Sequence, residues 1–510
     1  MAKPLLSASI AAPGFYGLNT QESSITLAAG FALQADNCVI DKYGRLGARK
    51  GWTYITQGNT GVDLKGAHEF IDINGTHTFG AWSDDGFYIV DGSSLIPVTY
   101  NGNNTLNDDV HWQAVTLNDA AYLACSHHAM VYFSPTAGVV DDVTNVASNS
   151  NKFVPQPNTL LSAYGRLWAG GVEDNRATVY WSDLLDGTVW EDGTAGSVDL
   201  SSVLVNGNDE VIALGAHSGR LIIFCRDNIV IYGSNGNVLD PADMQLIEVI
   251  NNVGCVARDS VHNTGTDILF LSDSGVMSLG RLIQEKSQPM RDLSKNIRDD
   301  LVRDVIGTDT TEIKAVYSQQ EAFYLLLIPE YKRIYCFDMR TALEDGSARV
   351  TVWDNQTQSN LYTTDDGLWF TNTDGMAKYY GYSDNGNNYT VKYYTNYFDF
   401  GDATKFKYLK RVGITLIGGS GQDFVLKAGY DYDDSYRSFP LQVANQSNAE
   451  YGVAEYNTAA EYTVGTLSDT VRAPMGGGGN VLQIGFEATI NGAQLSIQKL
   501  DMYTKEGRTY

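Results

Sequence analysis

Three clusters in the sequence hold residue types that bind metal ions. His127 and His128 are adjacent and precede an expected strand. Because neighbouring residues on a strand point to opposite faces, the two imidazoles do not converge on one ion. Asp431-Tyr432-Asp433-Asp434 and Asp384-Asn385-Gly386-Asn387-Asn388 offer oxygen atoms to calcium, but neither has the full loop with a closing Glu. We therefore expect a turn or core pair of histidines and no metal site.

Patterns for hydrolytic or phosphate chemistry are weak. Ser83-Asp84-Asp85-Gly86 and Ser272-Asp273-Ser274-Gly275 are similar to the aspartate box of sialidases, but they lack its aromatic residue and glycine at the correct offsets, which favours β-turns. The sequence has no GxSxG, HExxH or P-loop pattern, and Gly476 to Gly479 lacks the Lys-Ser or Lys-Thr of a phosphate cradle. We predict that the protein is not an enzyme and has no catalytic, cofactor-binding or metal-binding residues.

The eight tryptophans could stack against sugar rings, which keeps a second function class open. Because they lie in or beside expected strands, core packing is favoured over a sugar platform. The alternative is a carbohydrate-binding or carbohydrate-cleaving protein. It predicts a monomer or trimer, exposed aromatic side chains and, for hydrolysis, two carboxylates roughly 5 to 9.5 Å apart. The tryptophans considered include Trp82, Trp168, Trp181, Trp353 and Trp369.

Charge and composition restrict the partners. The net charge of −25 argues against a protein that grips nucleic acid, although it is compatible with a wall past which DNA slides. No apolar run reaches the roughly 20 residues of a membrane span. The five cysteines are odd in number, widely spaced and without a CxxC pattern, which indicates buried thiols in a reducing cytoplasm. The 51 Gly and 31 Tyr against 11 Pro favour strands joined by tight turns.

A unit of about fifty residues recurs along the chain. Each copy has an alternating strand, a short turn and a second apolar strand, and a third strand follows roughly a dozen residues after the turn. Successive turns lie about 44 to 55 residues apart, the spacing of four-stranded propeller blades. The spacing predicts an all-β protein with a β-propeller of six or seven blades over residues 59–388. The turns are Asn74-Gly75, Asn118-Asp119, Tyr164-Gly165, Ser218-Gly219, Thr264-Gly265, Gln319-Gln320 and Asp366-Gly367.

Segments outside the repeat are expected to form other structures. Apolar residues recur every four positions from Met290 to Val305, which predicts one helix against a blade edge. Residues 1–58 lack the blade pattern and are expected to form an extended N-terminal arm, in which Trp52-Thr53-Tyr54-Ile55 could supply the strand that closes the ring. Longer alternating strands in residues 389–510 predict a separate β-sandwich-like domain, with a polar, Gly-rich loop near 444–480.

Five segments near the ends of the chain share a pattern with one known family. They are Gly17–Ser23, Ala35–Ile40, Gly44–Trp52, Leu495–Leu500 and Lys505–Arg508, and they lie within about 60 residues at the two ends. The first three hold a Gly-rich phrase with Gln, an Asn-bearing strand and a turn of glycine, a basic residue and glycine, and the last two hold a strand and a basic tail. In these features the chain resembles the tail nozzle proteins (tail tubular protein B group) of short-tailed bacteriophages. With this resemblance, the carbohydrate alternative becomes a propeller protein of the phage tail.

The resemblance implies a structural subunit of the virion tail, assembled in the cytoplasm of the host bacterium. Six copies would form a ring below the head-to-tail adaptor of the portal complex, near tail fibre, spike or needle proteins. The ring would retain the genome and then conduct DNA through its lumen without specific binding. Because six copies carry about −150 charges, we hypothesise that part of this charge lines the channel and repels phosphate.

Overall fold

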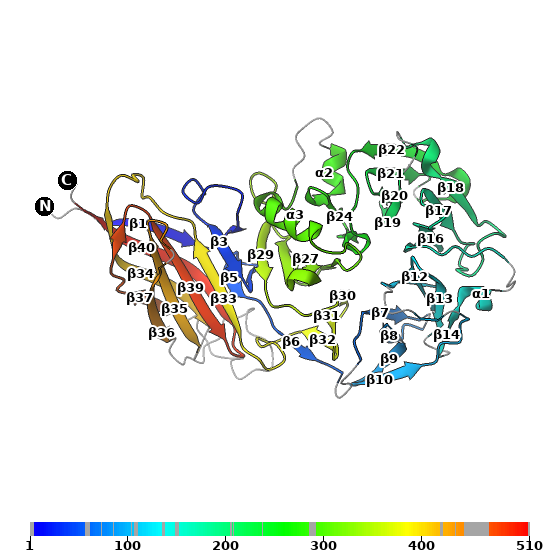
Figure 1. The fold of residues 1–510 in the computed structure, drawn as a ribbon, viewed down its shortest axis with the longest axis horizontal. Coiled ribbons are helices and arrows are strands. Elements are labelled where there is room, and N and C mark those ends of the chain that lie inside the picture. Colours follow the sequence, from blue (N-terminus) through cyan, green and yellow to red (C-terminus); the bar gives the residue numbers. More distant parts are fainter. Residues whose placement is uncertain are drawn as a thin grey trace.

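The computed structural model describes residues 5–56, 62–72, 74–84, 86–103, 105–106, 111–134, 138–147, 152–204, 207, 209–236, 238–284, 292–418, 422–433, 435–442 and 469–507. The chain forms a ring of small β-sheets at one end and a β-sandwich at the other, and both termini lie at the outer end of the sandwich (Figure 1). The all-β propeller fold predicted from the repeat is therefore confirmed.

Six sheets of the ring are four-stranded blades, and a seventh unit has three strands. Their inner strands contact one another in the order β7, β11, β15, β19, β23, β26, β30 and back to β7, which closes the ring. Blade 1 holds β7 (Gly66–Ile71), β8 (His77–Trp82), β9 (Phe87–Asp91) and β10 (Ser94–Val98). Blade 2 holds β11 (Gln113–Leu117), β12 (Ala120–Cys125), β13 (His128–Ser134) and β14 (Val139–Asp142).

The remaining blades continue in chain order. Blade 3 holds β15 (Thr159–Ala163), β16 (Arg166–Gly170), β17 (Thr178–Trp181) and β18 (Gly196–Asp199). Blade 4 holds β19 (Val211–His217), β20 (Arg220–Cys225), β21 (Asn228–Gly233) and β22 (Gln245–Asn251). Unit 5 holds β23 (His262–Asn263), β24 (Ile268–Ser272) and β25 (Gly275–Ser278). Blade 6 holds β26 (Lys314–Ser318), β27 (Phe323–Ile328), β28 (Arg333–Asp338) and β29 (Arg349–Trp353).

Blade 7 is completed by a strand from the start of the chain. It holds β30 (Asn360–Thr364), β31 (Gly367–Asn372), β32 (Gly375–Tyr379) and β6 (Trp52–Tyr54). Trp52 pairs with Tyr379, and Tyr54 pairs with Ala377. The prediction that the segment beginning at Trp52 closes the ring is thus confirmed.

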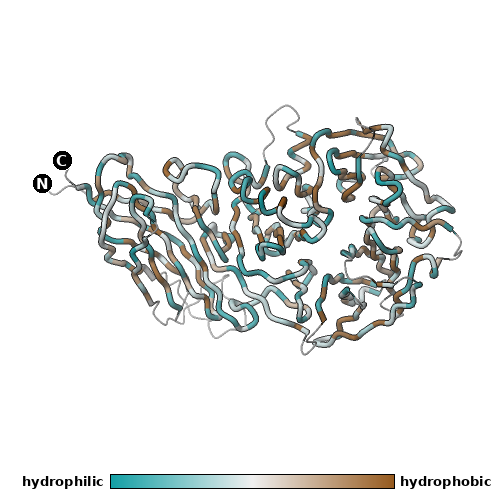
Figure 2. Tube along the Cα trace, viewed as in Figure 1, coloured by the Kyte–Doolittle hydropathy of each residue, from teal (hydrophilic) through white to brown (hydrophobic). Residues whose placement is uncertain are grey.

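All seven predicted turns join the first strand of a unit to its second. Several adopt the positive φ angles that two-residue hairpin turns require, such as 47° and 68° at Asn118 and Asp119 and 57° and 72° at Tyr164 and Gly165. The blades could be predicted from the sequence because turn-forming residues recur at a fixed distance from the apolar strands. Figure 2 shows apolar residues recurring along these strands, with polar residues in many of the loops.

Helices are short among the described residues. α1 (Val143–Val146) follows blade 2, while α2 (Leu279–Gln284) and α3 (Arg298–Ile306) follow β25. 3₁₀ helices are η1 (Leu200–Ser202), η2 (Pro241–Asp243), η3 (Arg258–Ser260), η4 (Lys295–Ile297) and η5 (Pro329–Tyr331). The helix predicted from Met290 is α3 preceded by η4, with Leu293, Ile297, Leu301 and Val305 all buried. Met290 itself lies outside the described residues. No helix in the described ranges is long and apolar enough to cross a membrane.

The sandwich uses strands from both ends of the chain. One sheet has the order β37 (Asp469–Ala473), β34 (Lys407–Gly418), β40 (Leu495–Glu506), β5 (Leu46–Ala48), β4 (Cys38–Ile40), with β1 (Leu6–Ala11) beside β40 and β38 (Gly478–Gly479) beside β34. The other has β2 (Gly17–Leu18), β3 (Phe31–Asp36), β33 (Tyr389–Thr395), β39 (Leu482–Ile490), β35 (Asp423–Tyr430) and β36 (Arg437–Gln442).

Two expectations about this region need correction. The N-terminal segment is not an arm, because β1 to β5 lie inside the two sandwich sheets. Nor is the sandwich separate, since β2 and β3 pair in parallel with β29 and make one ten-stranded sheet from blade 6 to β36. These pairings join residues more than 300 positions apart, which a local alternating pattern does not encode.

The predicted polar loop near 444–480 is only partly within the described residues. Residues 443–468 lie outside them. The glycine run of this loop contributes β38, in which Gly479 pairs with Lys407. The ammonium of Lys407 also donates to the carbonyl of Asn480 at 2.8 Å, which holds this end of the loop against β34.

Candidate functional site

The axis of the propeller holds a group of polar side chains from several blades. A cavity of about 670 Å³ opens at one end of the axis, lined by residues from the blade connections. A smaller cavity of about 170 Å³ lies among the inner strands. Arg258 lines both cavities and therefore separates them. Residues of the larger cavity include His111, His127, Asn158, Glu210, Arg226 and Glu312.

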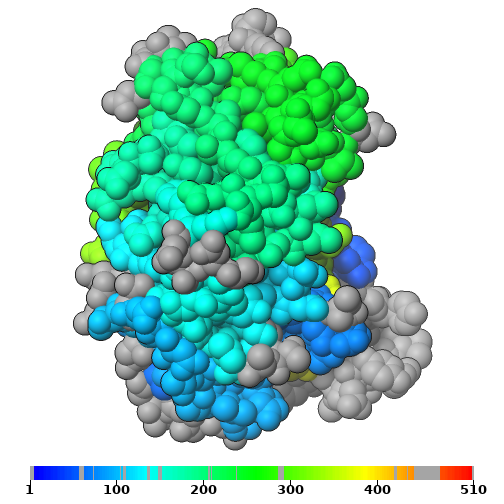
Figure 3. Space-filling model, turned by 90° about the vertical axis from the view of Figure 1, so that its right-hand side faces the viewer, coloured from blue at the N-terminus to red at the C-terminus, as the bar shows by residue number. Residues whose placement is uncertain are grey.

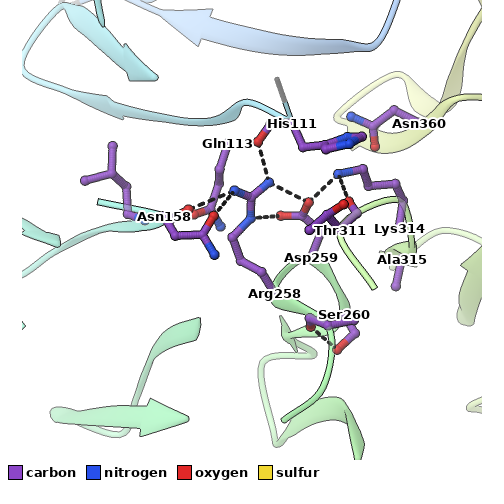
Figure 4. Close-up of polar contacts among 12 residues, drawn as sticks. His111, Gln113, Asn158, Arg258, Asp259, Ser260, Thr311, Lys314, Ala315 and Asn360 are labelled. Atoms are coloured by element: carbon purple, nitrogen blue, oxygen red, sulfur yellow. Dashed lines mark hydrogen bonds and ion pairs between the residues drawn. The ribbon is translucent and has the colours of Figure 1, made fainter. Parts of the chain in front are cut away.

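Arg258, Asp259 and Lys314 form an ion cluster on the axis, which we call the axial cluster (Figure 4). Arg258 donates from Nε and Nη2 to the two carboxylate oxygens of Asp259 at 2.9 and 2.8 Å. Lys314 donates to the same carboxylate at 2.5 Å and to the Thr311 carbonyl at 3.0 Å. One carboxylate thus serves two cations.

Arg258 also reaches across the axis to other blades. Its Nη1 donates to the backbone and side-chain oxygens of Asn158 at 2.8 and 3.1 Å, and its Nη2 donates to the His111 carbonyl at 2.9 Å. These partners precede β15 and β11, whereas Arg258 precedes β23 and Lys314 begins β26. The cluster consequently connects blades 2, 3 and 6 with unit 5.

Local hydrogen bonds fix the turn that presents Arg258 and Asp259. Both lie in η3, where the Ser260 hydroxyl donates to the Ala257 carbonyl at 2.6 Å and accepts from the Leu271 amide at 3.0 Å. Tyr324 donates its hydroxyl to the Ser260 carbonyl at 2.7 Å. The turn is therefore anchored to β24 and β27 before its charged side chains meet the other blades.

Burial and ion pairing determine the protonation of the axial groups. Burial alone would raise the pKa of Asp259, but Arg258 and Lys314 hold it well below its usual value. Burial lowers the pKa of Lys314, although Asp259 opposes this effect. Burial also lowers the pKa of His111 and His262, and that of His68 to about 4, so these histidines are neutral at pH 7. The axial cluster therefore holds the carboxylate of Asp259 in its ionised form between Arg258 and Lys314.

The geometry suits the axial cluster to fastening blades together. All five N–H donors of Arg258 have protein partners, which leaves none for a ligand. Asp259 stays ionised and is unsuited to act as a general acid. The Cys125 thiol lines the larger cavity, but burial raises its pKa, so it is not an activated nucleophile. The cluster therefore places charged side chains that bind one another between the two cavities at the propeller axis.

A second polar network joins the propeller to the sandwich, and we call it the joint. Arg49, with 2% of its side chain exposed, forms a two-point ion pair with Asp384 at 2.8 and 2.7 Å and stacks on the Tyr389 ring at 4.2 Å. Its Nε donates to the side-chain oxygen of Asn37 at 3.0 Å. Burial would lower the pKa of Arg49, but Asp384 more than offsets this and raises it.

Asn37 is the centre of the joint. Its side-chain amide donates to Asp354 and to the Thr390 carbonyl, and its side-chain oxygen accepts from the Asp354 amide at 3.2 Å. Asn37 has a φ of 55°, a left-handed conformation that Asn tolerates better than most residues. The joint thereby brings together the β3–β4 turn, the end of blade 6, the loop after blade 7 and the first strand of the late sandwich segment.

The two histidines and the two aspartate-box-like segments lie where the turn interpretation places them. His127 is exposed and His128 is buried against Trp112, with its Nδ1 at 2.8 Å from the Ala129 carbonyl. Ser272 bonds the Gly275 carbonyl in the β24–β25 turn, and Asp273 forms an ion pair with Arg226. The Ser83 amide bonds the Gly86 carbonyl in the β8–β9 turn, while Asp85 lies outside the described residues.

The calcium candidates use their carboxylates for protein contacts. Asp384 binds Arg49, and Asp431 accepts from the amides of Asn480 and Val481 at 2.6 and 3.1 Å. Asp433 accepts from the Ser435 amide at 2.9 Å, and Asp434 lies outside the described residues. Among described residues, no three His, Cys, Asp or Glu gather closely enough to hold a metal ion.

Core packing explains the tryptophans and the cysteines. Trp82, Trp168, Trp181, Trp353 and Trp369 are buried, as are Trp112 and Trp190, while Trp52 is half-buried in β6. All five cysteines are buried free thiols. The interpretation of tryptophans and cysteines as core residues is therefore confirmed.

Sequence reasoning missed the axial cluster and the role of Arg49. Arg258, Asp259 and Lys314 belong to no motif, and their partners are about 50 to 150 positions away. One signal was present, because Arg258-Asp259 is a charged pair beside the apolar segment Val253–Ala257 at the entrance to an inner strand. Because charged residues are rarely buried unless they are paired, this position could have been predicted to hold a buried ion pair.

Comparisons with known proteins found solved structures of low sequence identity to this chain. No family model and no curated protein matches the sequence. A computationally designed protein, Ika8, aligns with 71% of this chain and 98% of its own, at 13% identity and a TM-score of 0.38. PorZ, a surface component of the type-IX secretion system of Porphyromonas gingivalis, aligns with 68% of this chain and 42% of its own, at 12% identity and a TM-score of 0.34.

Proposed function

We propose that the protein is a structural subunit of a bacteriophage tail nozzle, located in the virion tail and assembled in the bacterial cytoplasm. Six copies would form a ring under the head-to-tail adaptor that retains the genome and then conducts it. Tail fibre, spike or needle proteins would be neighbours. The proposal assigns the protein a mechanical role, without an enzymatic step.

The observation that carries the proposal is the structural role of the family-like segments. Gly47 and Leu46 of the N-terminal segment pair with Ser496 and Ile497 of the C-terminal one, although about 450 positions separate them. Asn37 and Arg49, from the same N-terminal segments, form the centre of the joint. The residues that resemble nozzle proteins thus couple the propeller to the sandwich.

Continuous packing supports a load-bearing role. The ten-stranded sheet runs from blade 6 into the sandwich without an interruption in its hydrogen bonds. One hydrophobic core spans Phe15, Leu301, Tyr324, Tyr393 and Phe486, which belong to the N-terminal segment, α3, blade 6 and the sandwich. Close-packed interiors have low compressibility and transmit strain, so the two parts should move as one body.

The test is the mass of the purified protein, alone and with the adaptor ring of the same phage. The proposal predicts six copies bound to each adaptor ring. A protein that ignores the adaptor and instead binds or cleaves glycans would contradict it and support the carbohydrate alternative. That alternative has lost its main platform, because seven of the eight tryptophans are buried.

A further inference from the structure

The formal charge is divided unevenly between the two parts of the molecule. Residues 59–388 contain 19 Lys and Arg against 44 Asp and Glu, a net charge of −25. The remaining residues contain 16 of each, so the sandwich and N-terminal segments together are neutral. The propeller therefore carries the entire net charge. Two propellers repel each other, whereas a propeller and a sandwich do not, so a second propeller would approach the sandwich more easily.

One sheet face of the sandwich is basic and aromatic, and we call it the basic face. Strand pairing places Arg411 beside Tyr503 and Gly413 beside Arg472, so these residues share the outward side of β37, β34 and β40. The inward positions between them, Leu409, Val412 and Ile414, are buried. The basic face consists of Lys410, Arg411, Arg472, Lys505, Phe406, Tyr408 and Tyr503.

The cations of the basic face have no acidic partner within the described part of the chain. Arg411 stacks on the Tyr503 ring at 4.2 Å, and its Nε is buried without a hydrogen-bond partner. Lys410 lies 5.5 Å from the Tyr408 ring, and Tyr408 is 47% exposed. The one carboxylate that alternates onto this side, Asp501, is paired with Lys499 at 3.0 Å. Exposed cations that have no acidic partner among the described residues favour an acidic partner on another molecule.

The outer rim of blade 4 has the complementary character. Residues 234–251, which we call the acidic rim, contain three acids and no Lys or Arg. Asp240 and Asp243 are exposed there. Val238, Leu246 and Ile247 are exposed beside them, at 60%, 42% and 48%. Figure 3 looks at this end of the molecule, where the residues of blades 3 and 4 form much of the visible face.

The acidic rim also presents a free strand edge. β22 is the last strand of its sheet, and no described strand pairs with its outer side. It is seven residues long and contains no proline. The outer strand of blade 1 carries Pro97, and that of blade 2 carries Asp141 and Asp142, devices that discourage pairing. β22 instead carries Glu248 and has a bulge in its pairing with β21.

From these complementary surfaces we infer that the acidic rim of one copy docks on the basic face of a second copy of this chain. The two surfaces lie toward opposite ends of the long axis (Figure 1), so the contact is head-to-tail. Contacts of this heterologous kind generate closed rings when the rotation between copies closes. The inference deepens the proposed function, because it names the surfaces that join neighbouring ring subunits.

Two charge-reversed variants test the contact without the adaptor. K410E/K505E changes two exposed cations of the basic face, and D240K/D243K changes the acidic rim. Sedimentation velocity of the wild-type protein at its highest soluble concentration and low salt should show head-to-tail oligomers that dissociate as salt is added. Each variant alone should lose at least about tenfold in association constant.

Mixing the variants gives the decisive result. In an equimolar mixture, the intact rim of one variant meets the intact basic face of the other, and the reversed rim meets the reversed face with opposite charge. The mixture should therefore associate under conditions in which each variant alone does not. The matched control R298E/K332E makes the same charge change at two exposed cations elsewhere and should associate as the wild type does. Because Asp240 and Asp243 also stabilise their own loop, L246R provides a second rim variant whose side chain is exposed in the native fold.

Three outcomes would overturn the inference. They are a wild-type protein that stays monomeric, association unaffected by the variants, and capture of duplex DNA that K410E/K505E alone abolishes while no self-association occurs. The last result would assign the basic face to a polyanion. Six copies on the adaptor with wild-type-like assembly of both variants would leave the nozzle proposal intact and remove only this contact.

Discussion

Arg258 is the side chain on which the centre of the propeller depends. It contacts Asp259, Asn158 and the His111 carbonyl, and so links three blade connections. Removing one partner of a buried ion pair leaves an uncompensated charge, which is more costly than losing a surface pair.

We expect Arg258→Met to lower the free energy of unfolding by about 3 to 5 kcal/mol in urea titrations at pH 7. Arg176→Met is the matched control, because Arg176 is exposed and pairs with Glu210 at 3.4 Å, a contact worth about 1 kcal/mol or less. Equal effects of the two substitutions on the free energy of unfolding would show that the axial cluster does not stabilise the contacts between blades.

Asp292 provides a pH-dependent test at the same scale. Burial raises its pKa to about 6, and its Oδ1 has no hydrogen-bond partner among the described residues. A raised pKa means that the folded state binds the proton more tightly, so the ionised form destabilises the fold above pH 6 and the penalty disappears below about pH 4.

Asp292→Asn should therefore be more stable than the wild type by as much as about 3 kcal/mol at pH 8, and the two proteins should converge near pH 4. Urea titrations of both proteins at several pH values measure the difference. A constant difference across this range would mean that Asp292 does not titrate as its burial indicates.

At the scale of elements, the strand β6 closes blade 7 from a distance of more than 300 residues. The Ile55 amide donates to the Met376 carbonyl at 2.9 Å. Because alternate amides of a strand face the same side, the Thr53 amide also faces β32. Because the Thr53 side chain is exposed, a substitution there can remove the backbone hydrogen bond without removing buried side-chain contacts.

Thr53→Pro should remove that amide and open the ring, which would lower the melting temperature and expose the β32 edge to proteolysis. Thr53→Val keeps the amide and should melt close to the wild type. If the proline variant melted with the valine variant, β6 would not be a closing strand in solution.

The joint makes the second prediction at this scale. Arg49→Lys keeps the charge but loses the two-point contact with Asp384 and the stacking on Tyr389. We expect calorimetry to show a lower melting temperature for this variant than for the wild-type protein, because the contact between propeller and sandwich is weakened. An unchanged melting temperature would contradict the assigned role of Arg49.

The elements also show what could be predicted from sequence. Blade strands and turns were predicted because a hairpin's signals lie within about ten residues, as at Asn118-Asp119 between β11 and β12. The pairing of Gly17 with Val350 and of Leu46 with Ile497 was not predicted, because no feature of the neighbouring sequence identifies these partners. For the same reason the axial cluster was missed, whereas buried tryptophans were predicted from their strand context.

For the whole molecule, charge and shape lead to one expectation about the assembly. In the proposed ring, the axial cluster lies across each propeller axis, so DNA would pass between subunits. Propeller surfaces would supply an acidic wall to that lumen, because residues 59–388 hold the entire net charge of −25. A lumen rich in Lys and Arg would contradict the idea that the wall repels phosphate.

An electron cryomicroscopy map of the phage tail tests the central claim, that this chain is a ring subunit, most directly. We predict six copies of the propeller and sandwich around the tail axis, below the adaptor, with DNA density on the ring axis and outside each propeller. A map that places the chain in a peripheral spike, with an exposed aromatic cleft facing outward and no contact with the adaptor, would contradict it.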